Sequence, residues 1–300
     1  DLGGGNRLFA RFWVTNEGPG SHTGVAMGSV MTADGGIRQF KYGRERERWH
    51  LGAAGRYVQI ASAVLDLRPP YGRVEIDTNK YGIKLYARFA MPAAPPAMCA
   101  QRADGAGFDV LRLAEPLEGV AWVEGMGPPL AIDGSVTITH AWNARSEIDA
   151  VHRRVDAFAR DGDLAIFASV VTAPDGSEEA CVAVTGSGVD RVAVEGVKVA
   201  ADRLALAGTD GNYPIPAALR FQASGIDLRI APREQLLRID PLDVVPQPFR
   251  TILGLRSKPR RAWAAANWEL RLGVDAGEPV VERAGARAVT AVTFTNPWSR

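Results

Sequence analysis

The chain has 300 residues, of which 46% are hydrophobic, and it carries 35 basic against 34 acidic residues, a formal net charge of +1. This length fits one large domain or two of ordinary size. The balanced charge argues against a nucleic-acid-binding surface and against an acidic disordered tail. No apolar run reaches the roughly 18 residues that a membrane-spanning helix needs, so we expect no transmembrane segment.

Short sequence matches recur in the same order about 140 residues apart, a period longer than that of solenoid or propeller repeats. We therefore expect duplication of a whole domain, with one copy in residues 1–143 and the other in residues 144–300. The matching pairs are residues 29–35 with 169–176, residues 81–85 with 224–228, and Ala121-Trp122 with Ala262-Trp263.

The first half alternates apolar and polar residues in short segments, as half-buried strands require. Turn sequences such as Asp34-Gly35 separate these segments. The predicted strands are residues 8–14, 72–77, 83–89 and 136–142, with a further strand around Ser29.

One segment at the start of the second half has a conflicting pattern. In residues 146–158 the apolar positions recur at helical spacing, and Ser146 with Asp149 imitates a capping box. Its counterpart in the first half, residues 8–14, has the pattern of a strand, and equivalent positions should share a fold. We therefore predict a strand. Residues 219–222 are predicted as another strand, and helix is expected only as a turn or two within residues 233–239 or around 240–244.

These elements predict an all-β chain, built from two tandem antiparallel β-barrel or β-sandwich domains that are related by internal duplication. The junction is expected between Ile132 and Asp149, where the last strand of the first copy leads toward the second.

The two cysteines, Cys99 and Cys181, lie one in each half. They fit either a disulfide in an oxidising compartment or two isolated buried thiols. The sequence starts at Asp1 without Met, so either a leader has been removed or the chain is truncated, and both are compatible with a secreted or periplasmic location. The compartment, the pairing of the cysteines and the oligomeric state stay open.

Several kinds of catalytic site are not indicated. The four histidines, His22, His50, His140 and His152, include no i, i+4 pair, and the sequence has no Cys-x-x-Cys. No phosphate-binding loop or nucleophile elbow occurs either. We therefore expect no cofactor and no dedicated metal site. The alternative is a metal site whose ligands come from strands that lie far apart in sequence.

Two strands combine polar and aromatic residues on one face. Trp122 and Glu124 alternate on one strand, and His140 and Trp142 alternate on another. A carboxylic acid in apolar surroundings has a raised pKa and can deliver a proton at neutral pH. Glu124 and His140 are therefore the candidate catalytic residues. The alternative for each residue is a structural role, as a hydrogen-bonded core histidine or a packing tryptophan.

The candidate ligand-binding residues are Trp49, His50, Trp122 and Trp142. His50 follows residues 44–48, which alternate Arg and Glu, so a surface position is its alternative. The basic cluster Lys258-Pro259-Arg260-Arg261 predicts a solvated loop or, alternatively, contact with an anionic headgroup, which would make the chain a peripheral membrane protein.

Three segments carry a family resemblance. They are Thr139-His140-Ala141-Trp142, Arg56-Tyr57, and the run Leu65-Asp66-Leu67 followed by residues 69–74. In these segments and in its duplicated organisation, the chain resembles the hydroxyneurosporene synthase and AttH group, although Asn143-Ala144-Arg145 departs from that group's pattern after Trp142. The resemblance implies two lipocalin-like barrels. It also implies relatives that hydrate an isoprenoid double bond, relatives that accelerate intramolecular cycloadditions, and relatives without known activity.

The sequence thus leaves three hypotheses for function. The first is a protein that binds an apolar isoprenoid, polyketide or lipid-like molecule within a barrel or between barrels, and that hydrates or cyclises a polyene without a cofactor. The second is a carrier of such molecules without turnover. The third is a structural or attachment protein with filled barrels. In the first two, the partner is a small apolar molecule, and in none is it nucleic acid.

Overall fold

The computed structural model describes residues 1–15, 23–43, 49–52, 55–93, 98–103, 106–125, 127–143, 147–186, 188–201, 213, 215–244, 247–273 and 281–295. The Arg and Glu run at residues 44–48 lies outside them. The chain divides into two compact units. Unit 1 comprises Asp1–Pro96 with Ala114–Ile138, and unit 2 comprises Ala97–Leu113 with Thr139–Arg300.

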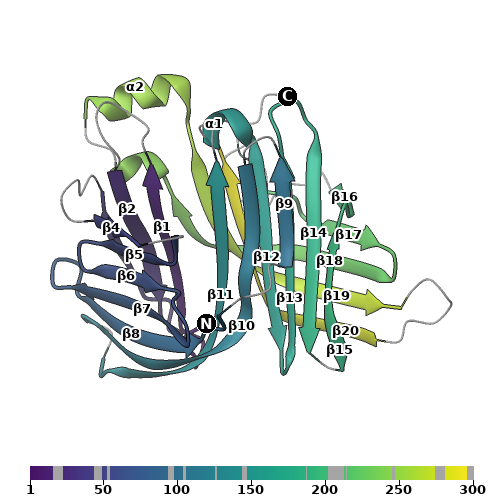
Figure 1. Ribbon diagram of the computed structural model, residues 1–300, viewed down its shortest axis with the longest axis horizontal. Helices are drawn as coiled ribbons and strands as arrows, with labels where there is room; N and C mark the ends of the chain where they lie inside the picture. The colour runs from purple at the N-terminus through teal and green to yellow at the C-terminus, as the bar shows by residue number, and fades with distance from the viewer. Residues whose placement is uncertain are drawn as a thin grey trace. The chain divides into compact units, whose positions relative to one another are not determined.

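Unit 1 is built from antiparallel strands and contains no α-helix among the residues described (Figure 1). Strands β10 and β11 are long, and each contributes residues to both units. The strands are β1 (Arg7–Thr15), β2 (Thr23–Met31), β3 (Ile37–Tyr42), β4 (Trp49–Leu51), β5 (Tyr57–Ile60), β6 (Ala63–Asp66), β7 (Tyr71–Thr78), β8 (Ile83–Ala90), β10 (Ala106–Val123) and β11 (Leu130–Asn143).

These strands form a three-stranded sheet, β1-β2-β3, and a larger sheet in the order β11-β10-β8-β7-β6-β5-β4. The start of the chain joins β11 through two backbone hydrogen bonds, from the Asp1 N-terminus to the Ser135 carbonyl at 3.0 Å and from the Ser135 N–H to the Asp1 carbonyl at 3.1 Å. Strand β1 therefore follows a segment that is already paired with β11.

The alternation predicted for residues 83–89 matches the burial of β8. Ile83, Leu85 and Phe89 are almost completely buried, whereas Lys84 and Tyr86 are exposed. Strand β7 alternates in the same way. The apolar faces of these strands thus form the core of unit 1, as an antiparallel sheet with one solvated face requires.

Unit 2 contains one sheet of nine antiparallel strands in the order β15-β14-β13-β12-β20-β19-β18-β17-β16. Its strands are β12 (Arg153–Asp161), β13 (Leu164–Thr172), β14 (Glu178–Gly186), β15 (Val189–Glu195), β16 (Lys198–Ala201), β17 (Leu219–Ala223), β18 (Ile226–Ile239), β19 (Arg260–Leu272) and β20 (Val281–Phe294). Strand β9 (Met98–Ala103), which pairs with β10, also belongs to this unit.

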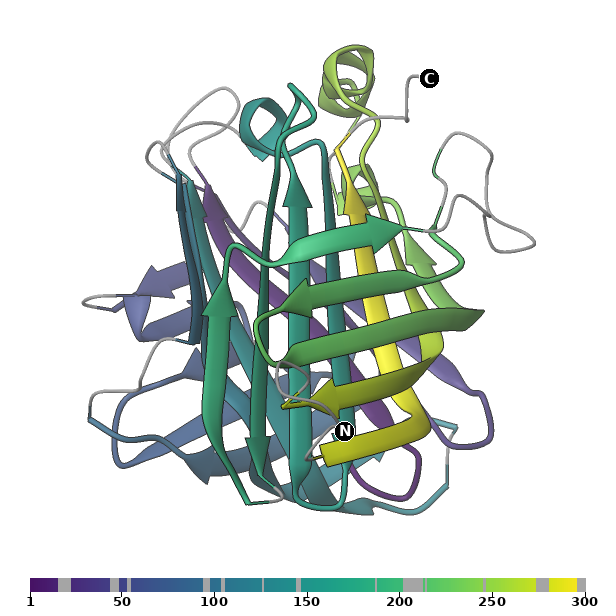
Figure 2. The same cartoon turned by 90° about the vertical axis from the view of Figure 1, so that its right-hand side faces the viewer.

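The sheet of unit 2 curls back on itself. Its two edge strands, β15 and β16, are joined by only Gly196 and Val197, so the opposite edges must meet. The Val197 N–H donates to the carbonyl of Ala180 in β14 at 3.4 Å. In Figure 2 the strands β16 to β18 cross in front of β13 and β14. This arrangement is a barrel-like closure with the apolar core inside.

Both faces of β13 and of the middle of β14 are buried, and β12 has one buried and one half-buried face. Val155, Ile166 and Val182 face the core of the barrel. On the opposite face, Phe167 stacks against Phe108 of β10 with ring centroids 5.8 Å apart. The β9–β10 segment therefore covers the outside of this part of the barrel, which explains why β13 reads as a nearly continuous apolar run.

Equivalent turns in the two units have the same pattern of backbone hydrogen bonds. In the β2–β3 turn the Thr32 N–H donates to Gly36, and in the β13–β14 turn the Ala173 N–H donates to Ser177, at 2.9 and 2.8 Å. The carboxylates of Asp34 and Asp175 accept the N–H two residues ahead in both turns. The all-β, duplicated, lipocalin-like fold predicted from the sequence is thus confirmed.

One of the three sequence matches is not a structural equivalence. Trp122 pairs with Lys84 next to the β7–β8 hairpin, whereas Trp263 pairs with Leu237, far along β18 from the β17–β18 hairpin. The Ala-Trp pairs therefore occupy different places in the two units.

The segment at residues 146–158, whose sequence combines a helical and a strand pattern, forms both structures. The strand prediction is confirmed for β12 and is wrong for α1 (Glu147–Ala150), which forms one helical turn before it. Helix around residues 240–244 is confirmed as η2 (Pro241–Val244), whereas residues 233–239 belong to β18. The sequence did not predict α2 (Phe249–Arg256). Among the residues described, no helix has the length and apolar character to cross a bilayer.

Candidate functional site

Unit 1 holds a cavity of about 340 Å³ at one end of its strands. Strand β10 contributes Ala121 and Val123, whose side chains are on the buried face of that strand, and β2 contributes Val30. The remaining lining residues come from the segment before β1, the β2–β3 turn and the segment before β11: Asn6, Thr32, Ala33, Asp34, Pro128, Pro129 and Leu130. A volume near 300 Å³ is at the lower end of the range for small-molecule sites.

The polar residues of this cavity already have partners within the protein. The Asn6 side chain donates to the Gly3 carbonyl at 2.9 Å and accepts from the Ala33 N–H at 3.1 Å. The Thr32 hydroxyl donates to Asp34 and lies 3.2 Å from the Gly36 carbonyl. The lining therefore offers mainly apolar contact to a ligand.

Among the described residues that line the cavity, Asp34 is the one with an ionisable side chain. Its exposed carboxylate accepts from the Thr32 hydroxyl and from the Gly36 N–H, and these bonds lower its pKa below the usual value. It therefore stays negatively charged at neutral pH. The equivalent Asp175 of unit 2 also accepts the N–H two residues ahead, together with the Ser177 hydroxyl, so the primary role of this carboxylate is to hold the turn.

Trp122 and Glu124 lie at the end of β10, as predicted, and share one face. That face is exposed: Trp122 is 36% exposed and Glu124 is also at the surface, whereas Ala121 and Val123 between them are buried. The Glu124 side chain lies over Gly82, and its backbone carbonyl accepts from Arg38 at 3.3 Å. Apolar surroundings of the kind expected for a proton-donating carboxyl are not found here.

Trp49 and His50 lie on β4 of unit 1. The Trp49 ring is half-buried against Gly24, and its indole Nε1 is buried without a hydrogen-bond partner among the residues described. His50 is exposed, and its ring centroid lies 5.7 Å from that of Tyr57. The surface position considered for His50 is therefore the observed one.

His140 and Trp142 lie together on β11, in the part of the strand that belongs to unit 2. Their ring centroids are 5.0 Å apart with an interplanar angle of 31°, so the predicted shared face is observed. The Trp142 ring packs against the backbone of Gly107 in β10, where any side chain would collide with it. His140 is exposed.

The structure thus brings together Trp122 with Glu124, Trp49 with His50, and His140 with Trp142. Glu124 and His140 belong to different units, and none of the six residues lines the 340 Å³ cavity. Their catalytic and ligand-binding roles stay predictions. Sequence reasoning missed the cavity residues Ala121 and Val123, although they are the opposite face of the strand that it singled out. The sequence feature that could have identified these two cavity residues is the modest size of their side chains.

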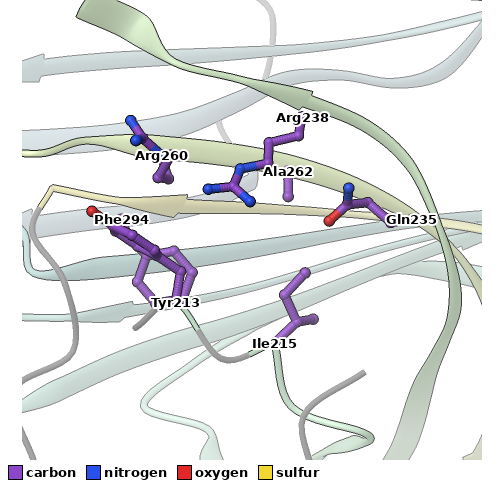
Figure 3. A pocket seen from close by; sticks show the side chains of 7 residues that line it. All are labelled: Tyr213, Ile215, Gln235, Arg238, Arg260, Ala262 and Phe294. Atoms are coloured by element: carbon purple, nitrogen blue, oxygen red, sulfur yellow. The ribbon is translucent and has the colours of Figure 1, made fainter. Parts of the chain in front are cut away.

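A second pocket, in unit 2, has a volume of about 20 Å³, which suits about one water molecule. Figure 3 shows the side chains of Arg238 and Arg260 above the rings of Tyr213 and Phe294. The two rings are in edge contact at 5.6 Å, and the Tyr213 hydroxyl donates to the Lys258 carbonyl at 2.8 Å. This pocket is too small for an organic ligand.

The two cysteines are adjacent, buried and free. Cys99 on β9 and Cys181 on β14 are 2% and 0% exposed. The pKa of Cys181 is raised, chiefly by its hydrogen bond with the Cys99 side chain and further by burial. Of the two alternatives from the sequence, the structure therefore has buried thiols. In the described part of the chain, no three His, Cys, Asp or Glu side chains gather as metal ligands.

Comparison with solved structures relates this architecture to known proteins. A crystal structure of a protein named as an AttH, from Nitrosomonas europaea, superimposes with a TM-score of 0.65 at 13% identity, covering 97% of this chain and 87% of that one. CghA with bound Sch210972 gives a TM-score of 0.60 at 11% identity, covering 97% and 85%, and CghA alone gives 0.59 at 11% with the same coverage.

No protein-family model matches the chain, and no curated protein matches it. Identities of 11 to 13% establish a shared fold and nothing finer. The expected AttH-like resemblance is therefore confirmed at the level of architecture: the chain has the lipocalin-like fold of AttH and CghA.

Proposed function

We propose that the protein binds a small apolar molecule of the isoprenoid, polyketide or lipid-like class in the cavity of unit 1. The observation that carries this proposal is the cavity of about 340 Å³, walled by Val30, Ala121, Val123 and the Pro128-Pro129 segment. Burial of apolar ligand surface against such walls contributes roughly 25 cal/mol per Å². Because Asn6 and Thr32 are engaged within the protein, the ligand need supply few hydrogen bonds.

The size of the cavity narrows the class of ligand. A volume near the lower limit for drug-sized ligands suits a short isoprenoid or polyketide chain. A long polyene would have to extend out of the cavity. Among the proteins of this fold, CghA has been crystallised with Sch210972, which supports small-molecule binding as a use of the architecture.

Binding without turnover is the form of the proposal that the geometry favours. Trp122 and Glu124 lie on the face of β10 opposite to the residues that wall the cavity, Ala121 and Val123. A general acid must come within hydrogen-bonding reach of the atom that it protonates. Hydration or cyclisation of a polyene by Glu124 and His140 therefore needs a different binding place from this cavity.

Two neighbouring positions provide a matched test. Ala121→Phe places a ring into the cavity, whereas Val120→Phe adds the same ring on the exposed face of the same strand. Uptake of short isoprenoid alcohols and fatty acids would be followed by native mass spectrometry and by displacement of an apolar fluorescent dye. We expect wild type and Val120→Phe to bind alike, and Ala121→Phe to lose at least about tenfold in affinity.

Two results would contradict the proposal. One is no uptake by the wild type of any molecule in the panel, and the other is equal binding by the two phenylalanine variants. Should Ala121→Phe fail to fold, Leu130→Trp at the edge of the cavity provides a second filling variant, since Leu130 is only half-buried.

A further inference from the structure

Among the side chains of helix α2 in unit 2 that the structure describes, a charged one packs inward and two apolar ones are exposed. Arg250 turns toward η2, where its guanidinium lies 2.7 Å from Asp243 and 3.6 Å from Asp240, and Gly254 on the same side lies against Leu242. Ile252 and Leu255, which are neighbours at i, i+3 spacing, point away from the unit and are 61% and 87% exposed. A helix of a soluble barrel normally buries its apolar side and exposes its charges.

Four basic residues, termed the cationic patch here, lie on α2, shortly after it in sequence, or on strands linked to it through Asp240. Asp240 joins Arg250 to Arg260, whose guanidinium lies 2.5 Å from it, and Arg238 borders the same small pocket as Arg260 (Figure 3). Lys258 is exposed two residues before Arg260. With Arg238, Arg250, Lys258 and Arg260 against Asp240 and Asp243, the patch carries four positive and two negative charges, a net charge of +2.

We propose that α2 docks on an anionic lipid bilayer, with Ile252 and Leu255 entering the interface between headgroups and acyl chains and the cationic patch facing the lipid phosphates. Interfacial helices combine these two features, an apolar face and flanking basic residues. Within unit 2, α2 lies beyond the end of β20, so the strands leave its outer side open (Figure 2). The basic cluster that the sequence singled out, Lys258 to Arg261, directly follows this helix.

A second copy of the chain is a poorer occupant for the same surface. Stable protein interfaces bury about 800 Å² on each partner, which two side chains of an eight-residue helix do not supply. Two cationic patches would also face each other and repel in a symmetric dimer. A lipid surface with negative headgroups accepts the apolar side chains and the charges together.

The test is co-sedimentation of the full chain with vesicles. Phosphatidylcholine vesicles containing about 30% phosphatidylserine would be compared with phosphatidylcholine alone at an ionic strength of about 0.1 M. We expect the wild type to bind the anionic vesicles at least about tenfold more strongly. Ile252→Ser with Leu255→Ser should reduce that binding about tenfold, and Lys258→Glu should weaken binding to the anionic vesicles only.

Tyr71→Ser is the matched control, because Tyr71 is 64% exposed on β7 of unit 1 and should leave vesicle binding unchanged. Far-ultraviolet circular dichroism would verify that each variant is folded. The proposal is overturned if the wild type does not prefer anionic vesicles, or if the double serine variant binds as well as the wild type. It is also overturned if gel filtration shows a dimer that the double serine variant dissolves, which would assign the helix to a second copy.

Discussion

The backbone N–H of Glu124 donates to the carbonyl of Gly82 at 2.8 Å and so attaches the end of β10 to the β7–β8 hairpin. In unit 2 the N–H of Gly273 donates to the carbonyl of Gly225 at 2.7 Å, between the end of β19 and the β17–β18 hairpin. Gly82 and Gly225 both have positive φ, 63° and 71°. The same contact at the same place in each sheet is the structural trace of the duplication.

Gly82→Ala should destabilise the protein by about 2 to 3 kcal/mol. The positive φ disfavours a side chain, and a Cβ here would lie 2.5 Å from the Cβ of Glu124. Gly35→Ala is the matched control, because φ is 88° there but nothing lies within 4 Å, so backbone strain alone should cost about 1 kcal/mol. Urea denaturation measures both losses. Equal losses would mean that the contact with Glu124 contributes nothing.

Asp66→Asn should destabilise unit 1 by about 1 to 2 kcal/mol at neutral pH. Asp66 is buried, and the Arg68 guanidinium, 2.8 and 2.6 Å from its oxygens, lowers its pKa. A lowered carboxyl pKa stabilises the fold above the unfolded value and loses that effect as the pH falls through the folded value. Because Arg68 is 59% exposed, solvent screening limits the gain.

The stability difference between wild type and Asp66→Asn should therefore shrink as the pH is lowered from about 7 to about 3. Glu118→Gln, which removes an ion pair whose side chains are 67% and 66% exposed, should change stability by less than about 0.5 kcal/mol. A difference for Asp66→Asn that is constant with pH would show that its ionisation does not stabilise the fold.

The two thiols should react with iodoacetamide only when the protein unfolds. The raised pKa of Cys181 leaves little thiolate near pH 8, and burial of both cysteines blocks access. Mass spectrometry should show labelling at least about a hundredfold slower in the folded protein than in guanidinium chloride. Fast labelling of the folded chain, or an absence of free thiols, would be inconsistent with this arrangement.

Glu124→Gln and His140→Gln should each change ligand affinity by less than about twofold, because both side chains are exposed and neither lines the cavity. Dye displacement measures the affinity, and product analysis with polyene substrates measures turnover. A loss of product with intact uptake would establish catalysis by these residues. A tenfold loss of affinity in either variant would contradict the placement of the ligand in the 340 Å³ cavity, which neither residue lines.

Much of the fold could be predicted from local patterns. Alternation in residues 83–89 specifies both the strand and its buried face, since Ile83 and Leu85 alternate with Lys84 and Tyr86. The repeat resolved the conflict at residues 146–158 only for β12, because the helical pattern does form one turn at Glu147–Ala150. Helix α2 was not predicted, and its described apolar side chains, Ile252 and Leu255, face solvent, so they supply no core-facing periodicity.

The site was harder to predict because alternation shows which residues share a face without showing which face is inside. Trp122 and Glu124 attracted attention by their chemistry, yet Ala121 and Val123 between them wall the cavity. The cavity also needs Asn6 and Leu130, which lie far apart in sequence and meet only through the sheet. No local pattern carries that information.

The most direct test of the central claim is to locate a bound apolar molecule by photolabelling. A diazirine-bearing fatty acid or short isoprenoid would be irradiated with the protein, and the labelled residues identified by peptide mass spectrometry. The account predicts labels on β2 and β10 at Val30, Ala121 or Val123, and their loss in Ala121→Phe. Labels confined to other segments, or labels that Ala121→Phe leaves unchanged, would contradict it.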